Sequence, residues 1–215
     1  MTNSNQLPTI WNSMGLLSSK VSITRYQVLG QLAEPLMDTL TRLLTQNAIV
    51  EIDDADMDQS MGWTSFEDPF NPDFSGSTFV MGSQFIFSFR MDKKAIPSKV
   101  VNKKFRQEIS KRLKESGKDF LSRNEKKQIK EDVIRGLSLR IPATPNVYDI
   151  LWNYEKNSLW FFSTQKTANE AFEIFFNKSF KLNLVRRFPY TAAQEILTDS
   201  EKDTLNRLTP CHFME

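Results

Sequence analysis

The residues whose types and spacing could support catalysis are four aspartates that lie close together in the sequence. They are Asp53, Asp54, Asp56 and Asp58. A metal-dependent nuclease uses two or three carboxylates to hold paired metal ions. A calcium-binding loop would also begin with alternating carboxylates, but Gln59 stands where that loop needs glycine and Ser65 where it needs glutamate. Because no second carboxylate set is evident on a neighbouring element, we interpret the cluster as a solvated acidic loop. A metal-dependent exonuclease that uses this cluster remains the alternative.

Histidine and cysteine are scarce in this chain. It has one of each, Cys211 and His212, which are adjacent and close to its end. Zinc sites built from several Cys and His ligands need residues that this chain lacks, and a Cys–His or Ser–His catalytic device would depend on this one histidine. The seven glycines are scattered, so no glycine-rich phosphate loop is present. We therefore predict a protein that is not an enzyme and has no catalytic residue, no metal and no cofactor.

Charge is distributed unevenly along the 215 residues, although the net charge is only +2. Residues 1–90 carry 4 basic and 10 acidic side chains, residues 91–140 carry 16 and 7, and residues 141–215 carry 8 and 9. Such a basic segment is typical of a surface that faces a polyanion. Two interpretations stay open at this point, a nucleic-acid interface and a solvated pair of charged helices.

If the segment binds nucleic acid, we expect it to contact the phosphate backbone of a duplex. The aromatic residues lie mostly in predicted strands and the charges mostly in predicted helices, whereas exposed aromatics beside a basic groove are typical of single-strand binding. The candidate DNA-binding residues are the basic side chains of this segment: Lys93, Lys94, Lys99, Lys103, Lys104, Arg106, Lys111, Arg112, Lys114, Lys118, Lys126, Lys127 and Lys130.

Two helices must position these residues. Pro97 begins the first helix and Gly117 can end it, because glycine adopts the left-handed conformation that ends many helices. The second begins at Ser122, whose spacing to Glu125 is that of a capping box. Each helix has an apolar stripe, formed in the first by Val101, Phe105, Ile109 and Leu113 and in the second by Ile129, Val133, Ile134 and Leu137.

The remaining segments alternate between strand and helix patterns. Strands are predicted over 20–28, 48–52, 78–90, 147–154, 159–164 and 182–188, and helices over 32–44, 167–180 and 195–208. Residues 53–77 are predicted to be a long loop, interrupted by Gly62-Trp63. Because helices do not separate the strands singly, a doubly wound parallel sheet is disfavoured. We predict an α+β fold with largely antiparallel sheet portions (β-α-β and β-β-α-β) joined by a projecting pair of basic helices.

The domain organisation follows from the same elements. We expect a loose N-terminal arm over 1–18 and a single domain over 19–215. Within that domain, 19–90 form a first sheet portion, 91–140 the basic helical pair, 141–188 a second sheet portion and 189–215 a C-terminal tail helix.

The middle of the chain carries a pattern of specific residues in a fixed order. A strand ending in Arg is followed by a basic turn, an Ile-Pro-Ser-x-Val-Val sequence and a charged helix. Gly62-Trp63 precedes this pattern, and the hairpin formed by the strands predicted over 147–154 and 159–164, which carries Trp152, follows it. The matching positions are Arg90, Lys93, Lys94, Ile96, Pro97, Ser98, Val100, Val101, Arg123, Glu125, Lys126, Ile129, Lys130, Glu131, Asp132 and Val133. Over roughly residues 20–188 this pattern resembles the RdgC family of bacterial recombination-associated proteins.

The resemblance implies a protein that binds duplex DNA without sequence preference. Members of that family form a homodimeric ring around the duplex and limit the access of RecA during recombination, and some are labelled as exonucleases. One departure is that Leu139-Arg140-Ile141-Pro142 stands where the family has Leu-Pro-Arg-Ala-Phe, so the aromatic residue at the tip is absent. Besides a duplex-DNA-binding protein and a metal-dependent exonuclease, a third interpretation of the chain is a protein-interaction module that binds a recombinase directly.

The expected location is cytoplasmic and associated with the nucleoid, with no membrane partner. No apolar run approaches the roughly 20 residues that a membrane span needs. The first residues lack a basic region followed by an apolar stretch, so we expect no secretory signal.

Overall fold

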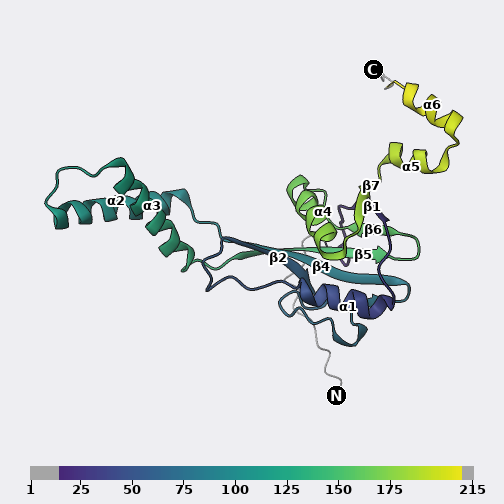
Figure 1. The fold of residues 1–215 in the computed structure, drawn as a ribbon, viewed down its shortest axis with the longest axis horizontal. Helices are drawn as coiled ribbons and strands as arrows, with labels where there is room; N and C mark the ends of the chain where they lie inside the picture. Colours follow the sequence, from purple (N-terminus) through teal and green to yellow (C-terminus); the bar gives the residue numbers. More distant parts are fainter. Residues whose placement is uncertain (1–14, 210–215) are drawn as a thin grey trace. The chain divides into compact units, whose positions relative to one another are not determined.

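The computed structural model describes residues 15–209 and has an α+β architecture (Figure 1). Its helices and strands follow one another along the chain in the order β1 (Thr24–Leu29), α1 (Leu36–Gln46), β2 (Gln59–Thr64), the 3-10 turn η2 (Ser75–Ser77), β3 (Val80–Met81), β4 (Gln84–Lys93), α2 (Ser98–Ser116), α3 (Arg123–Ser138), β5 (Thr144–Asn153), β6 (Ser158–Phe161), α4 (Lys166–Phe180), β7 (Asn183–Arg186), α5 (Pro189–Ile196) and α6 (Asp199–Arg207).

The strands form one seven-stranded sheet in the order β2-β4-β5-β6-β1-β7, and β3 pairs with β4. The pairs β1–β6, β1–β7, β2–β4, β3–β4 and β5–β6 are all antiparallel. The predicted α+β class with a largely antiparallel sheet is therefore confirmed.

The described chain divides into two compact units. Unit 1 contains residues up to 43, 75–87 and those from 148 onward, and unit 2 contains residues 44–74 and 88–147. Strands β4 and β5 contribute residues to both units. The single domain expected over 19–215 stays a prediction.

An aromatic core fills unit 1. Helix α4 places Ala168, Phe172 and Phe176 on one face because they recur every four residues, and all three are buried. The ring of Phe172 stacks on that of Phe161 from β6, with centroids 4.3 Å apart. Trp152 of β5 meets Phe176 edge to face at 5.3 Å. These contacts hold α4 against the face of the sheet that carries Tyr26, Trp152 and Phe161.

A close approach between two chain segments organises unit 2. The backbone N–H of Ile49 donates to the carbonyl oxygen of Trp63 at 2.9 Å, and the N–H of Trp63 donates to that of Asn47 at 2.9 Å. A Cβ atom at Gly62 would lie 2.3 Å from the Cα of Ile49, so only glycine allows this approach. Trp63 is fully buried, and its ring packs at 5.5 Å from that of Phe89.

Four predicted elements differ from those observed. The single strand expected over 78–90 is a hairpin, β3 and β4, because Gly82 takes a φ of 61° in the turn between them. The loop expected over 53–77 contains strand β2, which forms because it pairs with β4. Residues 48–52 contribute an isolated bridge at Ala48 rather than a strand. The helix expected over 195–208 is replaced by α5, which begins at Pro189, and α6, whose N-terminus Thr198 caps.

Candidate nucleic-acid interface

Local signals set the ends of α2 and α3, as predicted. Pro97 precedes α2 in an extended conformation, and Gly117 ends it with a φ of 64°. The capping box at the start of α3 is complete: the Glu125 N–H donates to the Ser122 hydroxyl at 3.2 Å, and the Ser122 N–H donates to the Glu125 carboxylate at 2.7 Å. The backbone N–H of Ser122, its hydroxyl group and Lys118 lower the pKa of Glu125 to about 2.

The two basic helices pack against each other within unit 2 (Figure 1). In the apolar stripe of α2, Val101 is buried, and Phe105, Ile109 and Leu113 are half-buried. Ile129 of α3 is fully buried. The α2 stripe is therefore fully buried at Val101 and only partly buried at the other three residues.

A row of basic residues lies on the open side of α2. Lys99, Lys103, Arg106 and Lys114 are spaced by four, three and eight positions, which places them on one side of the helix, where Arg106 borders the apolar stripe at Leu113. All four are exposed, and none forms an ion pair with a described carboxylate. The acidic residues of α2, Glu108 and Glu115, lie outside this row. We call these four residues the α2 row.

Several other candidate residues have carboxylate partners. Lys111 lies 4.0 Å from Glu115, Arg112 3.5 Å from Asp132, Lys118 3.3 Å from Glu125 and Lys127 3.8 Å from Glu131. These ion pairs compensate part of the charge, so these residues add less to a positive surface than the α2 row does. Lys93, Lys104, Lys126 and Lys130 are exposed.

Lys94 departs from the rest of the candidate set. Its side chain is buried, and its Nζ donates to the carbonyl oxygens of Asp53 at 3.0 Å and Ala55 at 2.9 Å. The ammonium group therefore fixes the acidic loop to the end of β4. We assign Lys94 a structural role and remove it from the set proposed to contact DNA.

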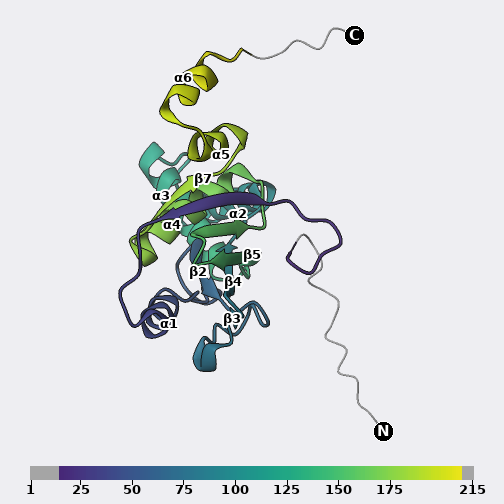
Figure 2. The ribbon, with the colours of Figure 1, turned by 90° about the vertical axis from the view of Figure 1, so that its right-hand side faces the viewer.

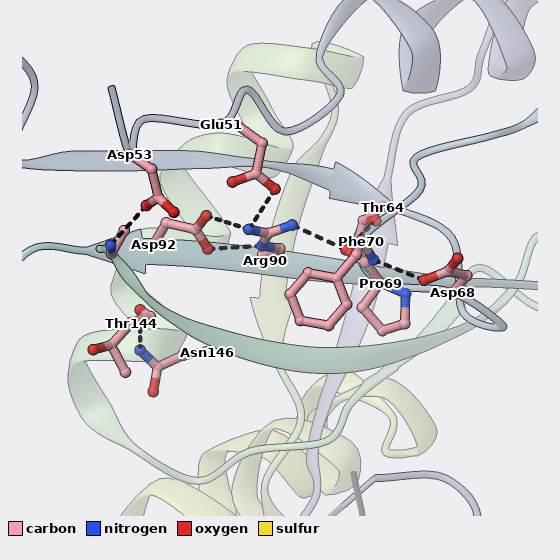
Figure 3. Close-up of polar contacts among 11 residues, drawn as sticks. Glu51, Asp53, Thr64, Asp68, Pro69, Phe70, Arg90, Asp92, Thr144 and Asn146 are labelled. Carbon is pink, nitrogen blue, oxygen red and sulfur yellow. Dashed lines mark hydrogen bonds and ion pairs between the residues drawn. The ribbon is translucent and has the colours of Figure 1, made fainter. Parts of the chain in front are cut away.

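A buried ionic cluster that no local sequence pattern indicates lies beside this loop (Figure 3). Arg90 on β4 donates to Asp92 through Nε at 2.8 Å, forms an ion pair with Glu51 at 2.8 Å, and donates to the Pro69 carbonyl oxygen at 3.2 Å. Its guanidinium also lies over the Phe70 ring, 4.8 Å from the centroid. Burial lowers the pKa of Arg90, but its hydrogen bonds to Asp92 and Glu51 outweigh that effect, so the net shift is upward.

The four aspartates of the acidic cluster do not converge on one point. Asp53 accepts a hydrogen bond from the Ala143 N–H at 2.8 Å, Asp56 lies 3.6 Å from Arg135, and Asp58 accepts from the Ser138 hydroxyl at 3.1 Å. Asp54 is exposed. Over residues 15–209, no group of three or more His, Cys, Asp or Glu side chains is arranged to hold a metal ion.

Cys211 and His212, the single cysteine and the single histidine of the chain, lie outside the described residues. No helix in the described range has the length and apolar character needed to cross a membrane.

Comparison with known proteins supports the resemblance drawn from the residue pattern. A search of curated proteins found no match. A family model described as "Putative exonuclease, RdgC" matches residues 22–199, a span that runs from β1 to the end of α5 and includes both basic helices. Because this match covers most of the sequence, the chain belongs to the RdgC family.

Proposed function

We propose that this protein binds duplex DNA without sequence preference, through phosphate contacts made by the basic helices, and that it does not cleave DNA. The observation that carries the proposal is the α2 row. It presents four exposed cationic side chains on one side of a helix, with no acidic residue among them. Phosphate contacts of this kind provide affinity but carry no base-sequence information.

The proposed biological role is supported by the family to which the chain belongs. We propose that the protein acts as a homodimer on duplex DNA and modulates recombination by limiting the access of a RecA-type recombinase. The membership of the chain in the RdgC family supports this role. Sedimentation equilibrium with and without duplex tests the dimer, and a strand-exchange reaction on protein-coated duplex tests the restriction of access.

Salt dependence tests the DNA interface directly. Each phosphate contact releases about 0.9 counterions, so the logarithm of the binding constant falls linearly with the logarithm of salt concentration. Changing Lys103→Ala should weaken binding to every duplex sequence alike and reduce the salt slope by about one. Alanine at all four positions of the α2 row should reduce the slope by about four.

The control is Lys20→Ala, because Lys20 is exposed but lies outside the basic segment. It should leave the affinity and the salt slope unchanged. If the fourfold alanine variant also binds as the unmodified protein does, the helices are a solvated face, and an interaction module that binds a recombinase becomes the better interpretation.

An exonuclease is the second candidate, because the description of the matching family model names that activity. Asp53, Asp56 and Asp58 each engage a donor or cation of the protein itself, which favours a structural role for the cluster. End-labelled duplex incubated with Mg²⁺ or Mn²⁺ should therefore remain intact. Time-dependent release of nucleotides that disappears in Asp54→Ala would establish the enzyme instead.

A further inference from the structure

The face of the unit 1 sheet opposite α4 carries a second group of residues suited to nucleic acid. On the α4 face, Tyr26 donates to Asn169 and Glu173 of α4, and Arg186 forms a hydrogen-bonded ion pair with Glu173 at 2.6 Å. Neighbouring strand residues point to opposite faces. Arg25 and Arg187, which flank Tyr26 and Arg186 in sequence, therefore lie on the open face.

Together with Trp160, these residues form a row across β6, β1 and the residue that follows β7. Arg25 of β1 pairs in register with Trp160 of β6. On the other side of β1, the Arg187 N–H donates to the Arg25 carbonyl oxygen at 2.7 Å, which makes the two arginines cross-strand neighbours. Arg25 and Arg187 thus lie side by side on the sheet, and Arg25 lies beside an indole ring.

Aromatic surface is exposed along this row. Trp160 is 37% exposed, and the Arg25 guanidinium lies 5.9 Å from the centroid of its ring. Phe188, which follows Arg187, is 53% exposed, and its ring stacks with that of Tyr190 at an interplanar angle of 15°. An exposed ring beside a cation offers a base a stacking surface next to a group that can contact phosphate.

A hollow of about 380 Å³ lies between the two arginines, Phe188 and helix α5. It is lined by Arg25, Arg187, Phe188, Pro189, Ala192 and Ile196. Pro189, Ala192 and Ile196 of this lining belong to helix α5. Only Arg187 and Phe188 separate α5 from β7 along the chain (Figure 2). The volume lies in the range of sites that take small organic groups.

We propose that Arg25, Trp160, Arg187 and Phe188 form a binding site for single-stranded nucleic acid, which we call the Arg25–Trp160 patch. Arginine contacts phosphate, and an exposed ring stacks on a base without regard to its sequence. Such stacking requires an unpaired base, because both faces of a base are covered in a duplex. The site therefore differs from the proposed duplex interface in its residues and in the form of nucleic acid that it takes.

Fluorescence anisotropy of the full chain with a labelled oligothymidylate of about 16 nucleotides tests the proposal, since single-strand sites of related chemistry span up to about that length. Trp160→Leu should weaken this binding about tenfold, and Trp160→Phe should restore most of it because an aromatic ring is kept. Both variants should change duplex affinity less than about twofold. The variant with alanine at all four positions of the α2 row should instead lose duplex affinity and keep its affinity for the oligonucleotide. Failure of one proposal is therefore distinguishable from failure of the other.

Two further variants keep the test independent of folding. Arg25→Gln alters an exposed side chain and should also weaken single-strand binding, whereas Lys178→Gln, an exposed residue of α4, is the matched control and should not. A 2-aminopurine base in the oligonucleotide should be quenched on binding to the unmodified protein and to Trp160→Phe, but not to Trp160→Leu.

The proposal is overturned if Trp160→Leu and Arg25→Gln bind the oligonucleotide as the Lys178→Gln control does. It is also overturned if these variants lose duplex and single-strand affinity in parallel, since one shared site would then serve both. If they dissociate a dimer in sedimentation and leave single-strand affinity intact, the patch is a self-association face instead.

Discussion

Arg90 and Asp92 form a salt bridge along a single strand, with both side chains on the same face of β4 and both buried. The Nε of Arg90 donates to Oδ1 of Asp92 at 2.8 Å, and the exposed fractions of the two side chains are 3% and 1%. The pair anchors the loop that carries Pro69 and the segment that carries Glu51 to the sheet (Figure 3). A buried guanidinium is tolerated here because carboxylate and carbonyl oxygens satisfy it.

Removal of one partner of this pair should be costly. Asp92→Asn keeps the shape of the side chain but leaves the buried Arg90 charge uncompensated, so we expect a loss of about 3–5 kcal/mol in the free energy of unfolding. Urea denaturation measures it. Glu51→Gln is the control, because the Glu51 side chain is 59% exposed and its ion pair should contribute no more than about 1 kcal/mol. Equal effects of the two changes would contradict the assignment of the buried pair.

Gly62 should tolerate no side chain. In Gly62→Ala, the new Cβ would lie 2.3 Å from backbone atoms of Ile49, so β2 and the segment at Ile49 must separate. We expect a destabilisation of about 3 kcal/mol or more, measured by thermal and urea unfolding.

Gly136 provides a matched comparison within unit 2. It lies inside α3, and a Cβ there would meet nothing within 4 Å. Gly136→Ala should raise stability by about 0.5–1 kcal/mol, since alanine is the better helix former. If both substitutions had the same sign, the close approach at Gly62 would not be what makes glycine necessary there.

The capping box of α3 should make the helix pair sensitive to acid. The pKa of Glu125 is lowered in the folded protein from 4.5 to about 2, first by the Ser122 N–H. A carboxyl group with a depressed pKa contributes stability above its unfolded pKa and loses that contribution as the pH falls through the folded value. Stability should therefore decline between about pH 4.5 and pH 2, and Glu125→Gln should remove that part of the decline. Carboxyl-carbon NMR of Glu125 should show a midpoint near 2, and a midpoint above 4 would contradict the capping geometry.

Lys93 and Lys94 are adjacent residues and should behave in opposite ways. Lys94→Met leaves two carbonyl oxygens without their donor, and we expect a loss of about 1–3 kcal/mol in stability with no change in the salt slope of duplex binding. Lys93→Met should change stability by no more than about 0.5 kcal/mol, because Lys93 is exposed. The salt slope of duplex binding by Lys93→Met should fall by up to about one if Lys93 contacts a phosphate. A reduced slope in Lys94→Met would return that residue to the DNA-contact set.

Elements that depend on neighbours in sequence could be predicted from the sequence itself. Pro97, Gly117 and the Ser122–Glu125 pair mark the ends of α2 and α3, because caps act over three or four residues. The hairpin of β5 and β6 and the apolar face of α4 were predictable for the same reason, since alternation and a four-residue repeat are local patterns. The basic character of α2 also follows from the sequence, and so does the side of the helix on which its charges lie.

Only the tertiary structure decided which residues are buried together when they are distant in sequence. Strand β2 has the polar sequence of a loop and is extended because β4 supplies its hydrogen bonds and Gly62 admits the segment at Ile49. Whether Lys93 or Lys94 is buried depends on where the carbonyl groups of Asp53 and Ala55 lie, some forty positions earlier in the chain. The row of Arg25, Trp160 and Arg187 exists because antiparallel pairing brings three separate strands into register, and no local pattern determines which residues face one another across strands.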